Sequence, residues 1–134
     1  AMEAALEVLK EVQGSRKIAV LGDMLELGKY TEEAHRAIGE QVKGSADMLI
    51  VVGPRAKSIA EGAISKKFPK KNIFSFDNAR QTAEFLTGAI KEGDIVLLKG
   101  SQGVRLERAV ASIMAHPEDA SKLLCRQEKQ WENR

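Results

Sequence analysis

The 134-residue sequence contains a single cysteine, Cys125, and only 4% aromatic residues. One cysteine cannot form an internal disulfide or a cysteine-ligated metal site, and such low cysteine usage favours a reducing cytoplasm. The sequence also lacks an apolar run of about 20 residues, the length that a membrane-spanning helix needs. It does not begin with a basic segment followed by a hydrophobic stretch, as a secretion signal would. We therefore expect a cytoplasmic protein that is not inserted in a membrane.

An excess of charge of one sign is also missing. Lys and Arg total 21 and Asp and Glu total 19, which gives a formal net charge of +2. A protein that binds nucleic acid by neutralising many phosphates needs a larger positive excess, so nucleic acid is not an expected partner. The 43% of hydrophobic and 30% of charged residues exclude a disordered chain and indicate a globular one.

What the sequence does contain is a regular alternation of helical and strand patterns. Short apolar runs, typical of strands buried on both faces of a parallel sheet, lie at residues 17–22, 48–53, 72–76 and 95–99. Helical spacing of apolar residues and helix-start signals predict helices at about residues 3–12, 32–43, 54–66 and 79–87. We therefore predict an α/β fold, with a Rossmann-like, mostly parallel sheet and helices on both faces, in a single domain over residues 1–116.

The end of the chain differs from the rest. After His116 the composition becomes polar, and Pro117 suits the first turn of a helix that would continue through residues 123 and 124. We therefore predict a helical C-terminal tail over residues 117–134. Its Trp131 would dock either on this domain or on a partner.

Motifs for several common activities are absent from the sequence. A P-loop needs G-x-x-x-x-G-K-[ST], and residues 99–101 carry lysine, glycine and serine in the wrong order. The dinucleotide-binding G-x-G-x-x-G pattern is missing after the first strand, where Gly22 and Gly28 stand alone. His35 and His116 are far apart and have no acids at ligand spacing, so no metal site is predicted.

The loop after the first predicted strand is the first candidate binding loop, because ligands bind beyond the carboxyl ends of parallel strands. It reads GDMLELG at residues 22–28 and is followed by His35 in the next helix. Asp23 and Glu26 could hold an ammonium group or a metal-bound phosphate. In the alternative, structural interpretation, the glycines shape the turn, Asp23 bonds nearby backbone, Glu26 is solvated and His35 is an ordinary helix residue.

The second candidate loop reads KGSQGVRLE at residues 99–107. Free backbone N–H groups at the start of the following helix, together with Lys99 and Arg105, suit an anion such as a carboxylate or phosphate. The alternative is a glycine-assisted turn with Arg105 and Glu107 on a solvated helix face.

Taken together, the two loops resemble the C-terminal domain of the Mur ligases over residues 2–114. The GDMLELG loop is most similar to the members that join D-alanyl-D-alanine to UDP-MurNAc-tripeptide in peptidoglycan synthesis. The resemblance implies that ATP phosphorylates the tripeptide carboxylate and that the dipeptide amine attacks the acyl phosphate. ATP and Mg²⁺ would be bound mainly by a central P-loop domain that this chain lacks, so the chain alone would be inactive.

The resemblance also implies which residues contact the ligands. The substrate-binding residues would be Asp23, Glu26, Lys99, Gly100, Ser101, Arg105 and Glu107. The cofactor-binding residues would be Gly22, Asp23 and His35. Lys99, Gly100, Ser101 and Arg105 would face the dipeptide carboxylate or the transferring phosphate. Asp23 and Glu26 would line the cleft near the amine and the nucleotide. No residue of this chain would itself be catalytic.

Two other functional classes remain open. Phosphoacceptor signalling domains also have an acid after the first strand and a lysine after the last, which Asp23 and Lys99 could imitate, with Asp77 as the acceptor. Around Asp23, however, the pair of adjacent acids that binds Mg²⁺ in those domains is missing. A non-enzymatic interaction module is the other alternative, with Trp131 as its docking element.

Overall fold

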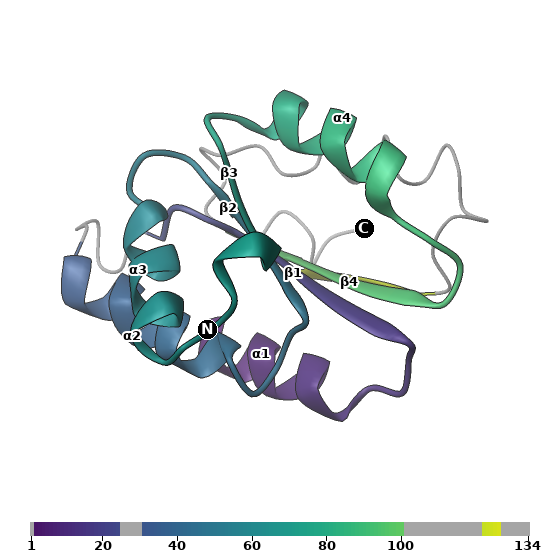
Figure 1. Cartoon of the computed structure of the whole chain (residues 1–134), viewed down its shortest axis with the longest axis horizontal. Helices are drawn as coiled ribbons and strands as arrows, with labels where there is room; N and C mark the ends of the chain where they lie inside the picture. Colours follow the sequence, from purple (N-terminus) through teal and green to yellow (C-terminus); the bar gives the residue numbers. More distant parts are fainter. Residues whose placement is uncertain (1, 25–30, 101–121, 127–134) are drawn as a thin grey trace.

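Five strands form one sheet in the computed structural model, which describes residues 2–24, 31–100 and 122–126 (Figure 1). The strands are β1 (Arg16–Gly22), β2 (Met48–Val52), β3 (Ile73–Phe76), β4 (Asp94–Lys99) and β5 (Lys122–Arg126). Their order in the sheet is β3-β2-β1-β4-β5, and every neighbouring pair is parallel. The predicted α/β fold with a parallel sheet is confirmed, and β1 lies at its centre.

Helices cover both faces of this sheet (Figure 1). On one face lie α1 (Met2–Glu11), α2 (Glu32–Val42) and α3 (Lys57–Ser65), and on the other lies α4 (Ala79–Ala89). A short 3-10 helix, η1 (Lys70–Asn72), leads into β3. None of the helices in the described part of the chain has the length and apolar character needed to span a bilayer.

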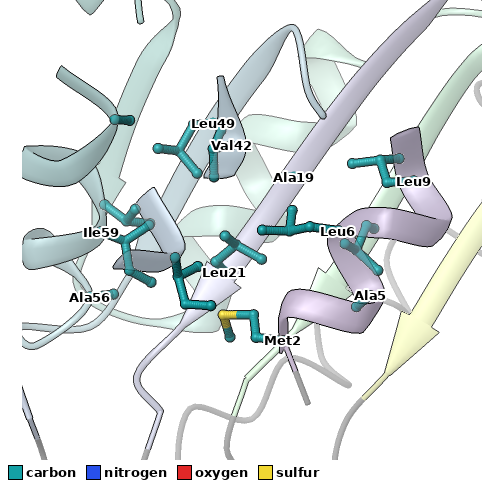
Figure 2. Close-up of a cluster of buried hydrophobic side chains, with 14 of the residues drawn as sticks. Met2, Ala5, Leu6, Leu9, Ala19, Leu21, Val42, Leu49, Ala56 and Ile59 are labelled. Atoms are coloured by element: carbon teal, nitrogen blue, oxygen red, sulfur yellow. The ribbon is translucent and has the colours of Figure 1, made fainter. Parts of the chain in front are cut away.

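The central strands separate two hydrophobic cores, one on each face of the sheet. In β1, Ala19 and Leu21 belong to the core shared with α1, α2 and α3, whereas Ile18 and Val20 belong to the core shared with α4. This alternation follows from the two-residue period of a strand. Figure 2 shows Leu6 of α1 reaching toward β1 in the first core. Burial of each such aliphatic side chain contributes about 1.5–3 kcal/mol.

Two helix boundaries differ from the sequence prediction. The third helix begins at Lys57 rather than at Pro54, because the chain first turns through Gly53, which has a φ of 103°. The fourth helix continues past Gly88 to Ala89. Glycine in a helix costs only about 1 kcal/mol relative to alanine, so Gly88 does not end the helix.

The predicted helical tail is wrong in part, because residues 122–126 form β5. Residues 123 and 124, which were expected to be helical, pair in parallel with β4. A short apolar run does not distinguish helix from strand, and the open edge of β4 offers unpaired N–H and C=O groups to a further strand. Residues 117–121 and 127–134, with Trp131, lie outside the described residues, and the domain boundary at residue 116 stays a prediction.

The N-terminus of α4 is capped by the side chain of Asn78. Its Oδ1 accepts a hydrogen bond from the Gln81 N–H at 2.9 Å, and the Gln81 side chain accepts one from the Asp77 N–H at 2.9 Å. We expect Asn78→Ala to lower the free energy of unfolding by about 1 kcal/mol, because the N–H of Gln81 loses its partner. Urea denaturation measures this loss, with Asn78→Asp as the control that keeps the acceptor. Equal stability of the two variants would contradict the capping role.

Candidate functional site

The two candidate loops start side by side at the carboxyl edge of the sheet. The Cα atoms of Gly22 and Val52 pair between β1 and β2, and those of Leu21 and Lys99 pair between β1 and β4. Paired strands lie about 4.8 Å apart. Asp23, which follows Gly22, and Lys99 therefore stand at the ends of neighbouring strands. Ligands bind at this edge in open parallel α/β sheets.

Asp23 is half-buried and is bonded to the backbone through one carboxylate oxygen. Its Oδ1 accepts a hydrogen bond from the Ala56 N–H at 2.7 Å, just before α3. The positive end of that helix favours a carboxylate in this position. A Cβ on Gly53 would lie 2.7 Å from the same oxygen, and the φ of Gly53 also requires glycine. Oδ1 of Asp23 thus bonds the backbone, as the structural interpretation of this loop expects.

The second oxygen of this carboxylate differs from the first. Within the described ranges, Oδ2 of Asp23 accepts no hydrogen bond. Asp23 as a whole is partly exposed, and a carboxylate oxygen at the ligand-binding edge of a sheet can accept a hydrogen bond from an ammonium or hydroxyl group. Asp23 can therefore hold the local backbone and contact a ligand at the same time.

His35 holds the start of the same loop from inside the protein. Its side chain is 0% exposed in the first turn of α2. Its Nε2 lies 3.0 Å from the Met24 backbone nitrogen, and its Nδ1 lies 2.9 Å from the Thr31 carbonyl oxygen. Because the Met24 N–H donates, Nε2 must be the acceptor, and Nδ1 then carries the proton that bonds Thr31. In this structure His35 is buried and bonds the backbone at the start of the loop after β1.

Lys99 and Gly100 lie at the end of β4. Lys99 is half-exposed and Gly100 is buried. The Cα of Lys99 pairs with Leu21 on one side and with Arg126 of β5 on the other. The ammonium group of Lys99 at this edge suits a carboxylate or phosphate. The position of Arg126 was not predicted, because its segment was expected to be helical.

Part of the predicted site falls outside the described residues. These predicted site residues are Glu26, Ser101, Arg105 and Glu107. Of the predicted residues that the structure describes, Gly22, Asp23, Lys99 and Gly100 come together at the carboxyl edge, and His35 lies behind them. Within the described ranges, no three His, Cys, Asp or Glu side chains gather as a metal ion would require.

The strand order contradicts the phosphoacceptor signalling alternative. Those domains have the order 2-1-3-4-5, in which the third strand lies beside the first. Here β2 separates β3 from β1. Asp77, which follows β3, therefore does not stand at the end of a strand adjacent to β1, and its backbone N–H donates to the Gln81 side chain at the start of α4.

Comparisons with known proteins agree with this architecture. The family model described as "Mur ligase, glutamate ligase domain" matches residues 1–102. The UDP-N-acetylmuramoyl-tripeptide–D-alanyl-D-alanine ligase of Bacillus subtilis (strain 168) is 31% identical over 118 residues, which are 87% of this chain and 26% of that protein. The protein of the same name from Escherichia coli (strain K12) is 32% identical over 114 residues, which are 84% of this chain and 24% of that protein.

A solved structure shows the same similarity. The crystal structure of MurF ligase from Thermotoga maritima in complex with ADP matches with a TM-score of 0.65 and 29% sequence identity. The match covers 85% of this chain and 25% of that one. The chain thus spans about a quarter of the length of the relatives that it matches.

Proposed function

Because this chain belongs to the Mur ligase family, we propose that it is the C-terminal, substrate-binding and closing domain of an ATP-dependent ligase of peptidoglycan synthesis. The ligase would join D-alanyl-D-alanine to UDP-MurNAc-tripeptide in the cytoplasm. The names of the relatives that match 84% and 87% of the chain support this choice of reaction.

The observation that carries the proposal is the position of Asp23 and Lys99 on neighbouring strands at the carboxyl edge. Oδ2 of Asp23 would accept a hydrogen bond from the amine of the dipeptide or from the nucleotide. Lys99 and Gly100 would face the dipeptide carboxylate or the transferring phosphate, since a lysine ammonium pairs well with both anions. We propose the roles predicted above also for Glu26, Ser101, Arg105 and Glu107.

The residues of this chain fit only part of a bound nucleotide. ATP, when bound, supplies the phosphoryl group that turns the tripeptide carboxylate into an acyl phosphate. The sequence contains no P-loop, and the described residues contain no cluster of three metal-ligating side chains. We therefore propose that ATP, Mg²⁺ and UDP-MurNAc-tripeptide are bound mainly by other domains, while this domain presents D-alanyl-D-alanine.

We expect the 134-residue chain by itself to release no phosphate that depends on both ATP and tripeptide. Correct positioning of reactants contributes about 7–11 kcal/mol to a bimolecular step, and one isolated domain cannot provide it. A colorimetric phosphate assay with ATP, Mg²⁺, tripeptide and dipeptide tests this expectation. Phosphate release by the purified chain would contradict the proposal that ATP, Mg²⁺ and UDP-MurNAc-tripeptide are bound mainly by other domains.

Titration of the isotope-labelled chain with D-alanyl-D-alanine tests the placement of the site. We expect the amide shifts to concentrate at residues 22–24, at Gly53 and at residues 99–100. Lys99→Ala should weaken the binding of the dipeptide about tenfold. A hydrogen bond to a charged group contributes roughly 1.5–3 kcal/mol, and we expect the lower end of that range because Lys99 is partly exposed to solvent.

A matched control for this titration is Lys91→Ala. Lys91 is exposed and precedes β4 at the opposite, amino edge of the sheet. The control removes the same charge and should leave the affinity unchanged. Equal effects of the two substitutions, or shifts confined to the amino edge, would contradict the proposed site.

A further inference from the structure

The loop after β1 is attached at two consecutive residues to two different helices. The carboxylate of Asp23 accepts the Ala56 N–H at 2.7 Å, next to α3. The N–H of the following residue, Met24, donates to Nε2 of His35 in α2 at 3.0 Å. These contacts span 33 and 11 positions of the sequence, so they depend on the packed arrangement of the helices.

The imidazole of His35 is itself held in one orientation. Its Nδ1 bonds the Thr31 carbonyl oxygen at 2.9 Å, and the backbone N–H of His35 bonds the same oxygen at 3.2 Å. With the side chain completely buried, neither ring nitrogen faces bulk solvent. The ring therefore offers Met24 a hydrogen-bond acceptor whose direction is set by α2.

The carboxylate of Asp23 is also held by its surroundings. Gly53 leaves room for the carboxylate where any other residue would place a Cβ against it. One oxygen is bound to Ala56, and the other receives no hydrogen bond from the described part of the chain. A shift of the backbone at Met24 would move the preceding carboxylate out of this arrangement.

We propose that His35 is a positioning residue for ligand binding at the carboxyl edge. Through Met24 it holds the backbone of the loop after β1, and thereby the direction in which Asp23 presents its second oxygen to a ligand. His35 does not contact the ligand. The identity of the ligand rests on the proposed function, whereas the contacts that support the positioning role do not.

Hydrogen exchange of the full chain tests the proposal without a ligand. In His35→Leu we expect the Met24 and Ala56 amides to exchange at least about tenfold faster, beyond any change at strand amides such as Val51. His35→Gln, which keeps an acceptor and a donor, should restore part of the protection. If the Met24 and Ala56 amides of His35→Leu exchange no faster relative to the strand amides than in the wild type, the proposal is overturned.

The matched control is Thr82→Val. Thr82 is also 0% exposed, and its side chain donates to the carbonyl oxygen four residues earlier, Asn78, at 3.0 Å, but it lies in α4 on the other face of the sheet. This variant should leave the Met24 and Ala56 exchange rates unchanged relative to those of the strands. Acceleration equal to that in His35→Leu would show a general loss of stability and overturn the positioning role.

A spectroscopic signature covers the case in which His35→Leu does not fold. In the wild-type chain, the ring ¹⁵N shifts should show a protonated Nδ1 and an unprotonated Nε2 at His35. The opposite tautomer would overturn the proposal, because its Nε2 could not accept from Met24.

Measurement of D-alanyl-D-alanine affinity tests the positioning role of His35 and the proposed function separately. If the wild-type chain binds D-alanyl-D-alanine, His35→Leu should weaken the affinity about tenfold and Thr82→Val should not, given that a charge-assisted hydrogen bond depends on its direction. Unchanged affinity in His35→Leu would overturn the positioning role. Selective exchange at Met24 together with no dipeptide binding by the wild type would support the contact but contradict the proposed function.

Discussion

Replacement of Asp94 by alanine is expected to lower the free energy of unfolding by about 3 kcal/mol. Asp94 is 2% exposed and binds Arg16 through both oxygens, at 3.2 Å from Nε and at 2.7 Å from Nη2. It also accepts the Lys91 N–H at 2.8 Å. The substitution leaves the Lys91 N–H without this acceptor, and it leaves the partly buried guanidinium with the Ala89 carbonyl oxygen, 2.8 Å from Nη2, but without its carboxylate partner. The side chain of Arg16 is 29% exposed and stays partly hydrated, so we expect the lower end of the range for broken buried pairs.

The pair is expected to persist over the whole neutral pH range. Hydrogen bonds to Asp94 raise the pKa of Arg16 above its ordinary value, against the opposing effect of burial. A raised pKa in the folded state means that the stabilisation is present below the unfolded pKa and is lost only as the pH rises through the folded one. The decrease in the free energy of unfolding caused by Asp94→Ala should therefore be the same at pH 6 and pH 8.

The matched control for Asp94→Ala is Glu61→Ala. Glu61 forms an ion pair with Arg36 at the same 2.7 Å, but the two side chains are 55% and 43% exposed. Exposed pairs contribute about 0–1 kcal/mol, so this loss should be small and should shrink further in high salt. Urea denaturation followed by circular dichroism measures both variants. An equal decrease in the free energy of unfolding in the two variants would contradict the larger contribution expected of the buried pair.

Replacement of Gly62 by alanine is expected to lower the free energy of unfolding by about 2–3 kcal/mol. Gly62 in α3 and Gly39 in α2 are both buried where the two helices touch. A Cβ on Gly62 would meet the carbonyl of Arg36, and a Cβ on Gly39 would meet the carbonyl of Ile59. Because backbone atoms cannot turn away as side chains do, the helices would have to separate. The higher helix propensity of alanine offsets only about 1 kcal/mol of this cost.

Gly88→Ala in α4 is the control for this prediction. Apart from its chain neighbours and the backbone of its own helix, no heavy atom in the described part of the chain lies within 4 Å of the position that its Cβ would occupy. We expect this variant to gain about 0.5–1 kcal/mol, since alanine loses less backbone entropy in a helix. The same denaturation measurement on both variants should give opposite signs. A loss in Gly88→Ala as large as in Gly62→Ala would contradict the steric explanation.

Most elements could be predicted from the sequence because their signals are local. The apolar runs predicted every boundary of β1, β2 and β4 to within one residue, since a strand buried on both faces must be apolar throughout. The start of α3 was missed because the turn at Gly53 is shaped by Asp23, which lies in another loop. Residues 123 and 124 were assigned to a helix because nothing in the segment itself reveals the open edge of β4.

In the candidate site, too, the sequence predicted the local features but not the contacts between distant parts of the chain. The sequence singled out Asp23, Lys99 and His35, because glycines, a charge at a strand end and a family motif are local features. It could not show which atoms these side chains contact, and the family resemblance placed His35 among the cofactor-binding residues. The positioning role that we propose for His35 rests instead on the hydrogen bond from the Met24 N–H, a contact between α2 and the loop after β1.

The sequence by itself determined that the chain is an α/β domain, that it carries two candidate loops and that it lacks a P-loop, since composition, periodicity and motifs are properties of neighbouring residues. Only the tertiary structure decided that β1 lies between β2 and β4 and that Asp23 and Lys99 end neighbouring strands. It likewise decided that Arg16 meets Asp94, 78 positions away. Such contacts depend on the order of the strands, and that order is set by the packing of the whole domain.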